Sequence, residues 1–261
     1  MPEGRLRNAE GRGNVLRTMQ ASNKPQDPAS LGFAAVAGER APLLLDLWHG
    51  CVGRTVRCVP NRRTVVVTES TGTWFAKWRR GAARNAAAEW NWLHVLPMLG
   101  LASQKPVAWL ARGRDSLLVT EGLPGRAFDA WWADAHRAGH GEVVERHAAL
   151  VVAPAVRRLH EAGLVYRDLY WNHVFCLDPA ALGAPAFLDA ERVFQPRWRR
   201  WRWWVKDLAG LAATAPDGVG LRARLRFLRE YLGDRPSAHR RLVAAIATKA
   251  ARIRRHVPRY G

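Results

Sequence analysis

The pattern of apolar residues changes near Gly122-Leu123-Pro124-Gly125, and this change limits the folds that the chain can adopt. Upstream of it, short runs of β-branched and aromatic residues alternate with turn residues, a pattern typical of antiparallel strands. These runs cover residues 55–59, 64–68, 73–78, 107–110 and 116–120. Between the third and fourth runs, the Ala-rich stretch 82–96 has apolar residues at helical spacing. We therefore expect a small antiparallel sheet with one helix.

Downstream of this point the pattern is helical. The stretch 142–161 predicts a long helix, and Pro154 within it is expected to kink that helix because proline has no backbone N–H. Three further helices are predicted at about residues 205–214, 221–231 and 238–255. The second half of the chain should therefore be mainly α-helical.

Together these patterns predict an α+β protein with two lobes. The β-rich N-terminal lobe is expected to span residues 31–122, and the helical C-terminal lobe residues 123–261. Residues 1–30 are rich in Gly, Asn and charged side chains, so we expect them to be poorly ordered. No apolar run approaches the roughly 20 residues that span a bilayer, and the first residues lack a secretory leader. The sequence therefore favours a cytoplasmic protein.

The charge is concentrated in the last quarter of the chain. The 261 residues carry 41 Lys and Arg against 22 Asp and Glu, a formal net charge of +19. Residues 192–261 hold 18 basic and four acidic side chains, and so +14 of that total. Such a surface attracts an anionic partner, either nucleic acid, a membrane or an acidic glycolipid. We expect no nucleic-acid partner, because the chain has no helix-turn-helix, zinc-finger or RNA-binding signature.

One stretch, LHEAGLVYRDLYWNH at residues 159–173, carries a pattern linked to chemistry. It resembles the LHxxGxxHRDxxxxN catalytic loop of protein-kinase-like phosphotransferases. In such loops an Asp accepts the proton of the attacking hydroxyl, and a polar residue five positions later holds magnesium. Asp168 matches the first position. The fifth residue after it is His173, with Asn172 beside it. Taken alone, an Arg-Asp pair is equally typical of a surface ion pair.

Three more residues occur in the order that kinase chemistry requires. Lys77 ends a predicted strand, as does the kinase lysine that neutralises phosphate oxygens. Glu89 lies 12 residues later in the predicted helix of the β-rich lobe, where it can pair with Lys77. Asp189 follows the apolar run Phe187-Leu188, at the position of a principal magnesium ligand. A surface lysine and a solvated glutamate are the alternatives, but four matches in order favour a kinase site.

Further motifs are similar to one narrower family. They comprise RRT at 62–64, KWRRG at 77–81, AEW at 88–90, PVA at 106–108, VTE at 119–121, RDLY at 167–170 with His173, and WRWWVKDL at 201–208. These motifs resemble the lipopolysaccharide kinase (Kdo/WaaP) family over about residues 44–215. The resemblance implies a protein-kinase-like fold and ATP-dependent phosphorylation of a sugar hydroxyl, on heptose or Kdo, in the inner core of lipopolysaccharide.

The resemblance also implies how ATP and Mg²⁺ are bound. Lys77 would contact the α- and β-phosphates, and Glu89 would orient Lys77. Asp189 would hold Mg²⁺ across the β- and γ-phosphates. His173 stands at the position of a further magnesium ligand. Magnesium prefers oxygen ligands, so the neighbouring Asn172 remains an alternative to it.

Several other residues receive supporting roles. No GxGxxG motif precedes the strands, so Arg62 or Arg63 in the first turn is expected to donate to phosphate oxygens, and of the two we assign Arg62 to the nucleotide site; a solvated hairpin tip is the alternative. Glu121 is assigned to the nucleotide side. Asp207 would be a buried carboxylate that holds catalytic-loop N–H groups, although a helix-start position suits it equally. Arg167 supports the same loop, and Tyr166 packs where the family usually has His.

Residues 197–206 concentrate four Trp and five basic residues. The arginines suit an acceptor rich in phosphate and carboxylate, since they bind such groups bidentately. Trp beside Arg is also typical of a membrane-interface segment. A third interpretation is that the tryptophans are buried and the arginines are solvated. The sequence leaves all three open.

Two other functions remain as alternatives. A small-molecule or antibiotic kinase of the aminoglycoside phosphotransferase type would usually keep Asn after the catalytic Asp and have an acidic acceptor pocket. The absence of a Gly-rich loop and the presence of His173 are compatible with a catalytically weak pseudokinase or a basic binding protein. The preferred partners are ATP and an anionic glycolipid or core oligosaccharide, with peripheral contact at the cytoplasmic face of the inner membrane.

Overall fold

The computed structural model describes residues 34–37, 41–70, 72–81, 83–178 and 183–255. They fall into two compact units. Unit 1 contains the described residues up to Met98, Ser103–Leu123 and Asp189–Arg192, and unit 2 contains Leu99–Ala102, Pro124–Leu188 and the described residues from Val193 onward. The expectation that residues 1–30 are poorly ordered lies outside the described residues.

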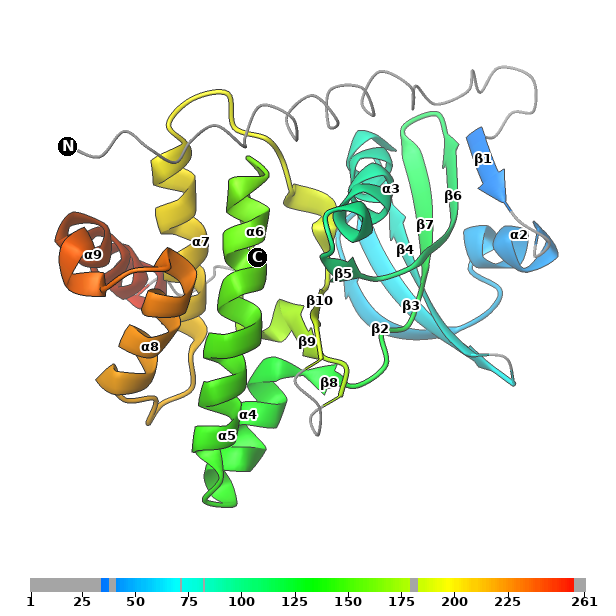
Figure 1. Ribbon diagram of the computed structural model, residues 1–261. Coiled ribbons are helices and arrows are strands. Elements are labelled where there is room, and N and C mark those ends of the chain that lie inside the picture. The colour runs from blue at the N-terminus through cyan, green and yellow to red at the C-terminus, as the bar shows by residue number, and fades with distance from the viewer. Residues whose placement is uncertain (1–33, 38–40, 71, 82, 179–182, 256–261) are drawn as a thin grey trace. The chain divides into compact units, whose positions relative to one another are not determined.

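Unit 1 is built on a six-stranded antiparallel sheet (Figure 1). In spatial order the strands are β1 (Ala34–Ala37), β6 (Pro106–Arg112), β7 (Asp115–Glu121), β4 (Gly72–Arg79), β3 (Arg62–Glu69) and β2 (Arg54–Val59). All five strands that the sequence predicts are confirmed as β2, β3, β4, β6 and β7. Antiparallel pairing joins β2 to β3, β3 to β4 and β6 to β7.

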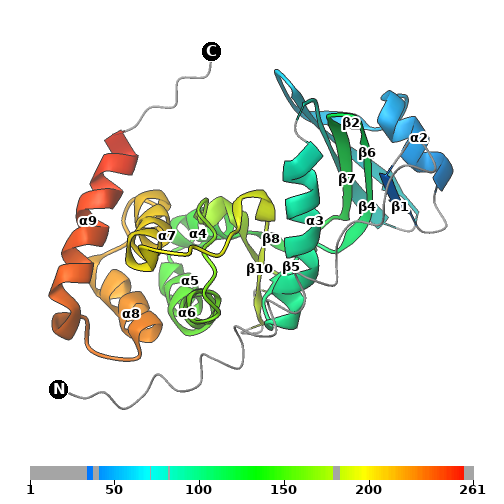
Figure 2. The same cartoon turned by 90° about the horizontal axis from the view of Figure 1, so that it is seen from above.

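The two faces of this sheet pack against different helices (Figure 2). On one face, Trp74 and Ala76 of β4 belong to a buried cluster with Leu44 and Leu47 of helix α2 (Ala41–His49). Side chains alternate along a strand, so Lys77 of β4 lies on the opposite face. That face packs against helix α3 (Ala83–Met98), which is the helix predicted at residues 82–96.

Helix α2 corrects the expectation that the β-rich lobe holds a single helix. The segment is only nine residues long, and its run of leucines shows no clear period. Isolated helices of this length are marginal in water. Burial of Leu44 and Leu47 against the sheet therefore stabilises this helix.

Unit 2 is mainly helical. Its helices are α4 (Phe128–Arg137), α5 (Gly141–His147), α6 (Ala153–Glu161), α7 (Arg200–Thr214), α8 (Leu221–Leu232) and α9 (Arg240–Arg255). A small sheet has the order β5 (Ala102–Ser103), β10 (Pro185–Phe187), β9 (Val174–Cys176) and β8 (Arg126–Ala127). Aromatic rings contribute to the core, where Phe128 of α4 stacks on Trp171 with ring centroids 4.7 Å apart. The predicted α+β architecture is thus confirmed.

The kink expected at Pro154 takes the form of a π-helical turn. Residues Ala148–Val152 make this turn between α5 and α6. Pro154 lacks the N–H that an α-helix would pair with the carbonyl of Leu150. A wider turn just before the proline accommodates the missing hydrogen bond without ending the helix.

Helix α7 begins at Arg200, five residues earlier than the sequence predicts. Asp207 therefore lies inside the helix, and its alternative role as a helix-start residue is wrong. The run of Trp and Arg hides the helical period, because both faces carry large side chains. The structure also divides the tryptophans, since Trp198 is 77% exposed whereas Trp203 and Trp204 are half-buried.

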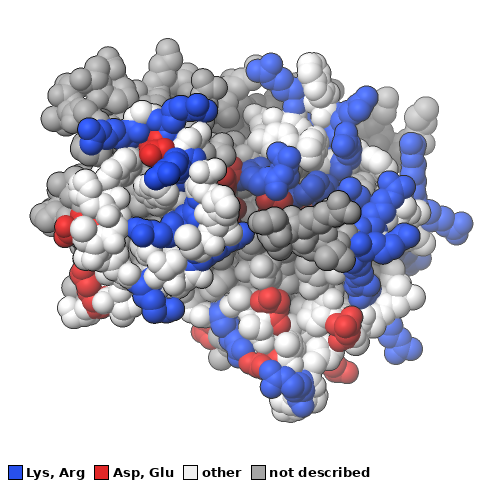
Figure 3. All heavy atoms as spheres, turned by 180° about the vertical axis from the view of Figure 1, so that it is seen from behind, with Lys and Arg blue, Asp and Glu red and all other residues white. Residues whose placement is uncertain are grey.

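Exposed basic side chains are frequent on α8 and α9, and they include Arg222, Arg226, Arg229, Arg240, Arg241, Arg252, Arg254 and Arg255. On the face shown in Figure 3, Lys and Arg outnumber Asp and Glu. Within the described ranges, none of the helices combines the length and apolar character that a membrane span requires.

Gly210 of α7 packs directly against the loop that carries Asp168. A Cβ at Gly210 would lie 2.4 Å from the carbonyl oxygen of Leu169. In an open helix, Gly to Ala is favourable by about 1 kcal/mol, but here the loop backbone has to shift. We expect Gly210→Ala to lower the free energy of unfolding by about 1–3 kcal/mol in urea titrations. The control Gly183→Ala has open space at its Cβ and should stay within about 0.5 kcal/mol of the parent. Equal stability of both variants would contradict this packing.

Candidate active site

Unit 1 brings together three of the predicted site residues, Lys77, Glu89 and Asp189. The Nζ of Lys77 lies 2.6 Å from Oε1 of Glu89 and 3.3 Å from Oδ1 of Asp189. Lys77 comes from β4, Glu89 from α3, and Asp189 precedes the 3₁₀ turn Ala190–Arg192. Lys77 and Glu89 are buried, and the side chain of Asp189 is 23% exposed. The amine is therefore oriented by a buried carboxylate and faces a second one that solvent reaches.

Two residues that the sequence analysis did not single out, Arg79 and Glu191, extend this cluster. The Nη2 of Arg79 lies 2.7 Å from Oε2 of Glu89 and 2.7 Å from Oε2 of Glu191. Burial acts to lower the pKa of Arg79, but the charges of Glu89 and Glu191 outweigh it and raise that pKa. The available signal was spacing, because Arg79 shares a strand face with Lys77 and Glu191 stands two residues after Asp189.

Arg62, at the start of β3, completes the ion cluster. Its Nη2 lies 3.3 Å from Oδ2 of Asp189, and its Nη1 lies 3.3 Å from Oε2 of Glu191. Arg62 is thus paired with carboxylates rather than standing at a solvated hairpin tip. The cluster as described sets three cations against three carboxylates, so its charges are balanced. A phosphate group approaching Arg62 would compete with the carboxylates of this cluster.

Carboxylate oxygens of Glu89, Asp189 and Glu191 lie within 4.8 Å of one another, close enough to share a metal ion. Magnesium takes oxygen ligands and usually keeps several waters together with one or two carboxylates. Glu89 does not suit this role, since it is fully buried and both oxygens are paired with Lys77 and Arg79. Asp189 does suit it, because its carboxylate is partly exposed and a carboxylate oxygen of Glu191 lies within 4.8 Å, although Lys77 and Arg62 pair with it in this structure.

In unit 2, Asp207 of α7 holds the loop that carries Asp168. Its Oδ2 accepts a hydrogen bond from the N–H of Tyr166 at 2.6 Å, and its Oδ1 accepts one from the N–H of Arg167 at 2.7 Å. Asp207 is 1% exposed, and Arg167 has a positive φ of 71°. Two hydrogen bonds to a buried charge fix this uncommon backbone conformation.

A second layer of hydrogen bonds lies behind Asp207. The Nε2 of His160 lies 3.3 Å from Oδ2 of Asp207, and its Nδ1 lies 2.8 Å from the hydroxyl of Tyr231. Burial, together with the charges of Asp207 and Glu161, raises the pKa of Tyr231. The hydroxyl therefore keeps its proton, and the ring of His160 bridges it to the carboxylate of Asp207. This chain links α6, α7 and α8 to the loop.

Asp168 itself is partly exposed, and its direction is set by two neighbours. Its Oδ1 lies 3.8 Å from the Nζ of Lys206, which also donates to the carbonyl of Arg167. The Nδ1 of His173 donates to the carbonyl of Asp168 at 2.8 Å, so only Nε2 of His173 remains for another ligand. Lys206 was missed by the sequence analysis, although it directly precedes Asp207.

The remaining predicted residues have other surroundings. The side chain of Asn172 is exposed, and Tyr166 is fully buried with its hydroxyl donating to the carbonyl of Leu188 at 2.8 Å. Glu121, at the end of β7, pairs with the exposed Lys105 at 3.0 Å rather than joining the ion cluster. The guanidinium carbon of Arg167 lies 5.9 Å from the ring centre of Trp203.

Comparison with solved structures supports the fold. A structure of WaaP in complex with acyl carrier protein matches with a TM-score of 0.69 at 26% identity, covering 84% of this chain and 98% of that one. The aminoglycoside-3′-phosphotransferase of type VIII matches with a TM-score of 0.52 at 19% identity, covering 80% of this chain and 100% of the other. The second likeness shows the fold alone, and both confirm the protein-kinase-like prediction.

Comparison with protein sequences gives the family. The lipopolysaccharide core heptose(I) kinase WaaP of Escherichia coli strain K12 is 28% identical over 262 residues, covering 84% of this chain and 97% of that protein. Another WaaP of Escherichia coli is 29% identical over 235 residues, covering 77% and 88%. These relatives favour the lipopolysaccharide kinase prediction over the aminoglycoside alternative. The model of the lipopolysaccharide kinase (Kdo/WaaP) family matches residues 72–231, more than half of the chain, which therefore belongs to that family of kinases.

Proposed function

We propose that this chain transfers the γ-phosphoryl group of ATP to a heptose hydroxyl in the inner core of lipopolysaccharide. The observation that carries this proposal is the alignment with heptose(I) kinases over 84% of the chain. The local geometry supports it, because Asp168 and the ion cluster around Lys77 are the groups that phosphoryl transfer needs. Heptose is proposed over Kdo because both Escherichia coli relatives are heptose(I) kinases.

On the acceptor side, Asp168 orients the sugar hydroxyl and accepts its proton. The hydroxyl oxygen forms a bond to the γ-phosphorus while the bond from that phosphorus to the leaving ADP oxygen breaks. Lys206 and His173 keep Asp168 directed by holding carbonyl groups of the same loop. Asp207 acts through the backbone of Tyr166 and Arg167, and is a positioning residue.

On the nucleotide side, Lys77 contacts the α- and β-phosphates and Glu89 orients it. Arg62 exchanges its carboxylate partners for phosphate oxygens, which its fork of N–H groups binds bidentately. Glu121 remains our proposal for a further nucleotide contact. A bound magnesium ion would supply the charge neutralisation that the phosphate oxygens need during transfer.

Asp189 is the residue that would hold this metal ion. Its carboxylate is the partly exposed one next to Lys77. His173 and Asn172 stay as alternative further ligands, and the oxygen of Asn172 suits magnesium better.

The reaction would take place at the cytoplasmic face of the inner membrane, with the chain as a peripheral protein. The exposed arginines of α8 and α9 support this proposal, since an anionic lipid surface attracts each of them.

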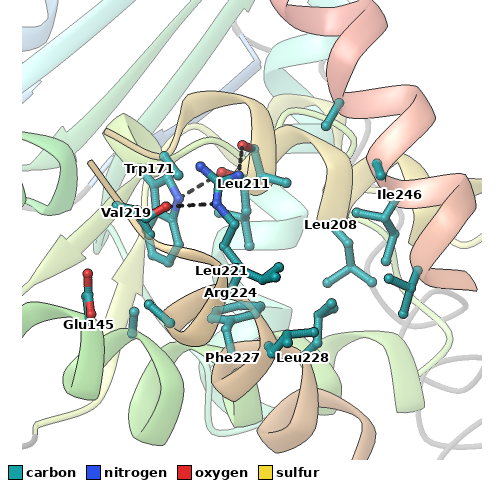
Figure 4. A pocket seen from close by; sticks show the side chains of 18 of the residues that line it. Glu145, Trp171, Leu208, Leu211, Val219, Leu221, Arg224, Phe227, Leu228 and Ile246 are labelled. Carbon is teal, nitrogen blue, oxygen red and sulfur yellow. Dashed lines mark hydrogen bonds between the residues drawn. The ribbon is translucent and has the colours of Figure 1, made fainter. Parts of the chain in front are cut away.

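We further propose an acyl carrier protein as a partner, because a relative of known structure carries one. Unit 2 has an apolar cavity of about 520 Å³, a volume typical of small-ligand sites. Figure 4 shows Leu208, Leu228 and Ile246 lining it, with Arg224 hydrogen-bonded at one end. Burial and the charge of Arg254 lower the pKa of Arg224. An anion bound beside these two arginines would therefore be stabilised by their positive charge. An acyl chain on an acidic carrier fits both features.

Replacement of Asp168 tests the catalytic assignment. We expect Asp168→Asn to reduce kcat by about 10²–10⁴-fold, because the variant cannot accept the hydroxyl proton. The unfolding midpoint should be unchanged, since Asp168 is partly exposed. The measurement is phosphate transfer from ATP to deacylated core oligosaccharide, with Asp217→Asn as an exposed control in the same unit. Parent-like turnover of folded Asp168→Asn would overturn the assignment.

Replacement of Asp189 tests the metal assignment without relying on turnover alone. The parent should gain thermal stability from ATP only when magnesium is present, because Asp189 holds the ion that ATP shares. Asp189→Asn should need about tenfold more magnesium for the same shift, a loss of about 1.4 kcal/mol. Asp217→Asn should behave as the parent. An unchanged magnesium requirement in Asp189→Asn would rule out this ligand.

A filled cavity tests the partner. Ala247 of α9 lines the cavity and Ala244 of the same helix does not, although both are exposed. We expect Ala247→Phe to weaken binding of palmitoyl-acyl carrier protein at least about tenfold in calorimetry, since the ring occupies the space for the chain. Ala244→Phe should leave binding unchanged. Two results would contradict an acyl site here. One is equal affinity of both variants for palmitoyl-acyl carrier protein, and the other is tighter binding of the carrier without an acyl chain than of the palmitoylated carrier.

A further inference from the structure

A second cavity in unit 2 lies in the Trp- and Arg-rich segment before and within the start of α7. Its volume is about 680 Å³, and Gln195, Arg197, Trp198, Arg199, Arg202 and Trp203 are among the residues that line it. Among the described residues that line this cavity, none is acidic. Three guanidinium groups surround one hollow, so their positive potentials add up inside it. The same charges spread over a solvated helix face would not be concentrated in this way.

The segment is fixed beside the catalytic loop. The N–H of Val165 donates to the carbonyl of Phe194 at 3.0 Å, and the N–H of Phe194 donates back at 3.1 Å. Val165 stands three residues before Asp168. Arg202 and Lys206 are one helical turn apart and so share a face of α7, and Lys206 lies next to Asp168. Arg202 of the cavity therefore lies one helical turn, about 6 Å of rise, from the lysine whose side chain pairs with Asp168.

The tryptophans of this cavity differ in how firmly they are held. Trp203 forms a rigid wall, because its ring packs edge-on against Phe194 at 5.0 Å and lies under Arg202 and Arg167 at 5.6 and 5.9 Å. Trp198 is 77% exposed, which is costly for so large an apolar ring. An exposed aromatic ring beside several arginines is typical of a surface that binds a ligand.

We propose that this cavity binds an anionic group of the acceptor, a carboxylate or phosphate on a sugar next to the one that is phosphorylated. Arginine forks bind such groups bidentately, and a Trp ring can cover the apolar face of a sugar while its N–H stays available. The proposal rests on the proposed function and adds the residues that recognise the acceptor. Arg197, Arg202 and Trp198 would then determine which oligosaccharide is accepted.

An anionic membrane is the competing partner for a segment of this composition. The structure favours the saccharide for two reasons. The arginines line a hollow, and Trp203 is half-buried in its wall against Phe194, whereas a membrane anchor would project its ring outward. The cavity also adjoins the loop of Asp168, where an acceptor has to bind.

The test compares matched charge variants with matched acceptors. Two variants change the cavity: the double cavity variant Arg197→Gln/Arg202→Gln and the single variant Trp198→Ala. The control is the α8 variant Arg222→Gln/Arg226→Gln, which removes the same charge from exposed positions of that helix. The probes are deacylated core oligosaccharide and its carboxyl-methylated, dephosphorylated form. Binding is measured by calorimetry without ATP, and steady-state transfer is measured separately.

The parent and the α8 variant should bind the anionic oligosaccharide at least about tenfold more tightly than the neutralised form. The double cavity variant should lose this preference and show a raised KM for the acceptor, with kcat and the KM for ATP within about twofold of the parent. Trp198→Ala should weaken both probes alike, because the ring contacts the sugar and not its charge.

Two results would overturn the proposal. One is an unchanged preference for the anionic oligosaccharide in the double cavity variant. The other is a loss of binding to phosphatidylglycerol vesicles in that variant while oligosaccharide binding is retained, which would assign the surface to the membrane. Preferential binding without any transfer by the parent would instead leave the subsite standing and refute the proposed function.

Discussion

A charged carboxylate can be buried only where hydrogen-bond donors or cations pair with it. Two buried carboxylates, Asp207 and Glu89, hold the residues of the proposed site in place. In unit 2, the carboxylate of Asp207 accepts hydrogen bonds from two backbone N–H groups of the loop that carries Asp168, and it lies beside His160. In unit 1, Glu89 is met by Lys77 and Arg79. Removing either charge would leave its partners buried and unpaired, so the sequence around each carboxylate is constrained as a set.

These contacts explain how a short chain holds kinase chemistry without a Gly-rich loop or a long activation segment. Arg79 binds Glu89 and Glu191 together, and thereby ties the turn that follows Asp189 to the sheet of unit 1. Arg62 adds a second tie from β3. In unit 2 the chain after this turn is pinned by the backbone bridge between Val165 and Phe194. Each segment that carries a residue of the proposed site is thus fixed by local ion pairs or backbone hydrogen bonds.

Much of the fold could be predicted from the sequence, because strand alternation and helical spacing are local signals. Lys77, Glu89, Asp168 and Asp189 could be singled out because their order and spacing match a chemical pattern. Other features depend on pairing across the chain. Helix α2 is stabilised by the sheet it covers and not by its own nine residues. Arg79 has the spacing that places it on the strand face of Lys77, but arginines are so frequent in this chain that spacing alone does not distinguish it from the others.

The central claim is that this site phosphorylates a sugar of the lipopolysaccharide core. The most direct measurement is the mass and NMR spectrum of deacylated core oligosaccharide after incubation with the protein, ATP and magnesium. The account predicts the addition of one phosphate on a heptose hydroxyl and no modification of an aminoglycoside offered in parallel. Phosphate on the aminoglycoside, with an unchanged core oligosaccharide, would contradict it.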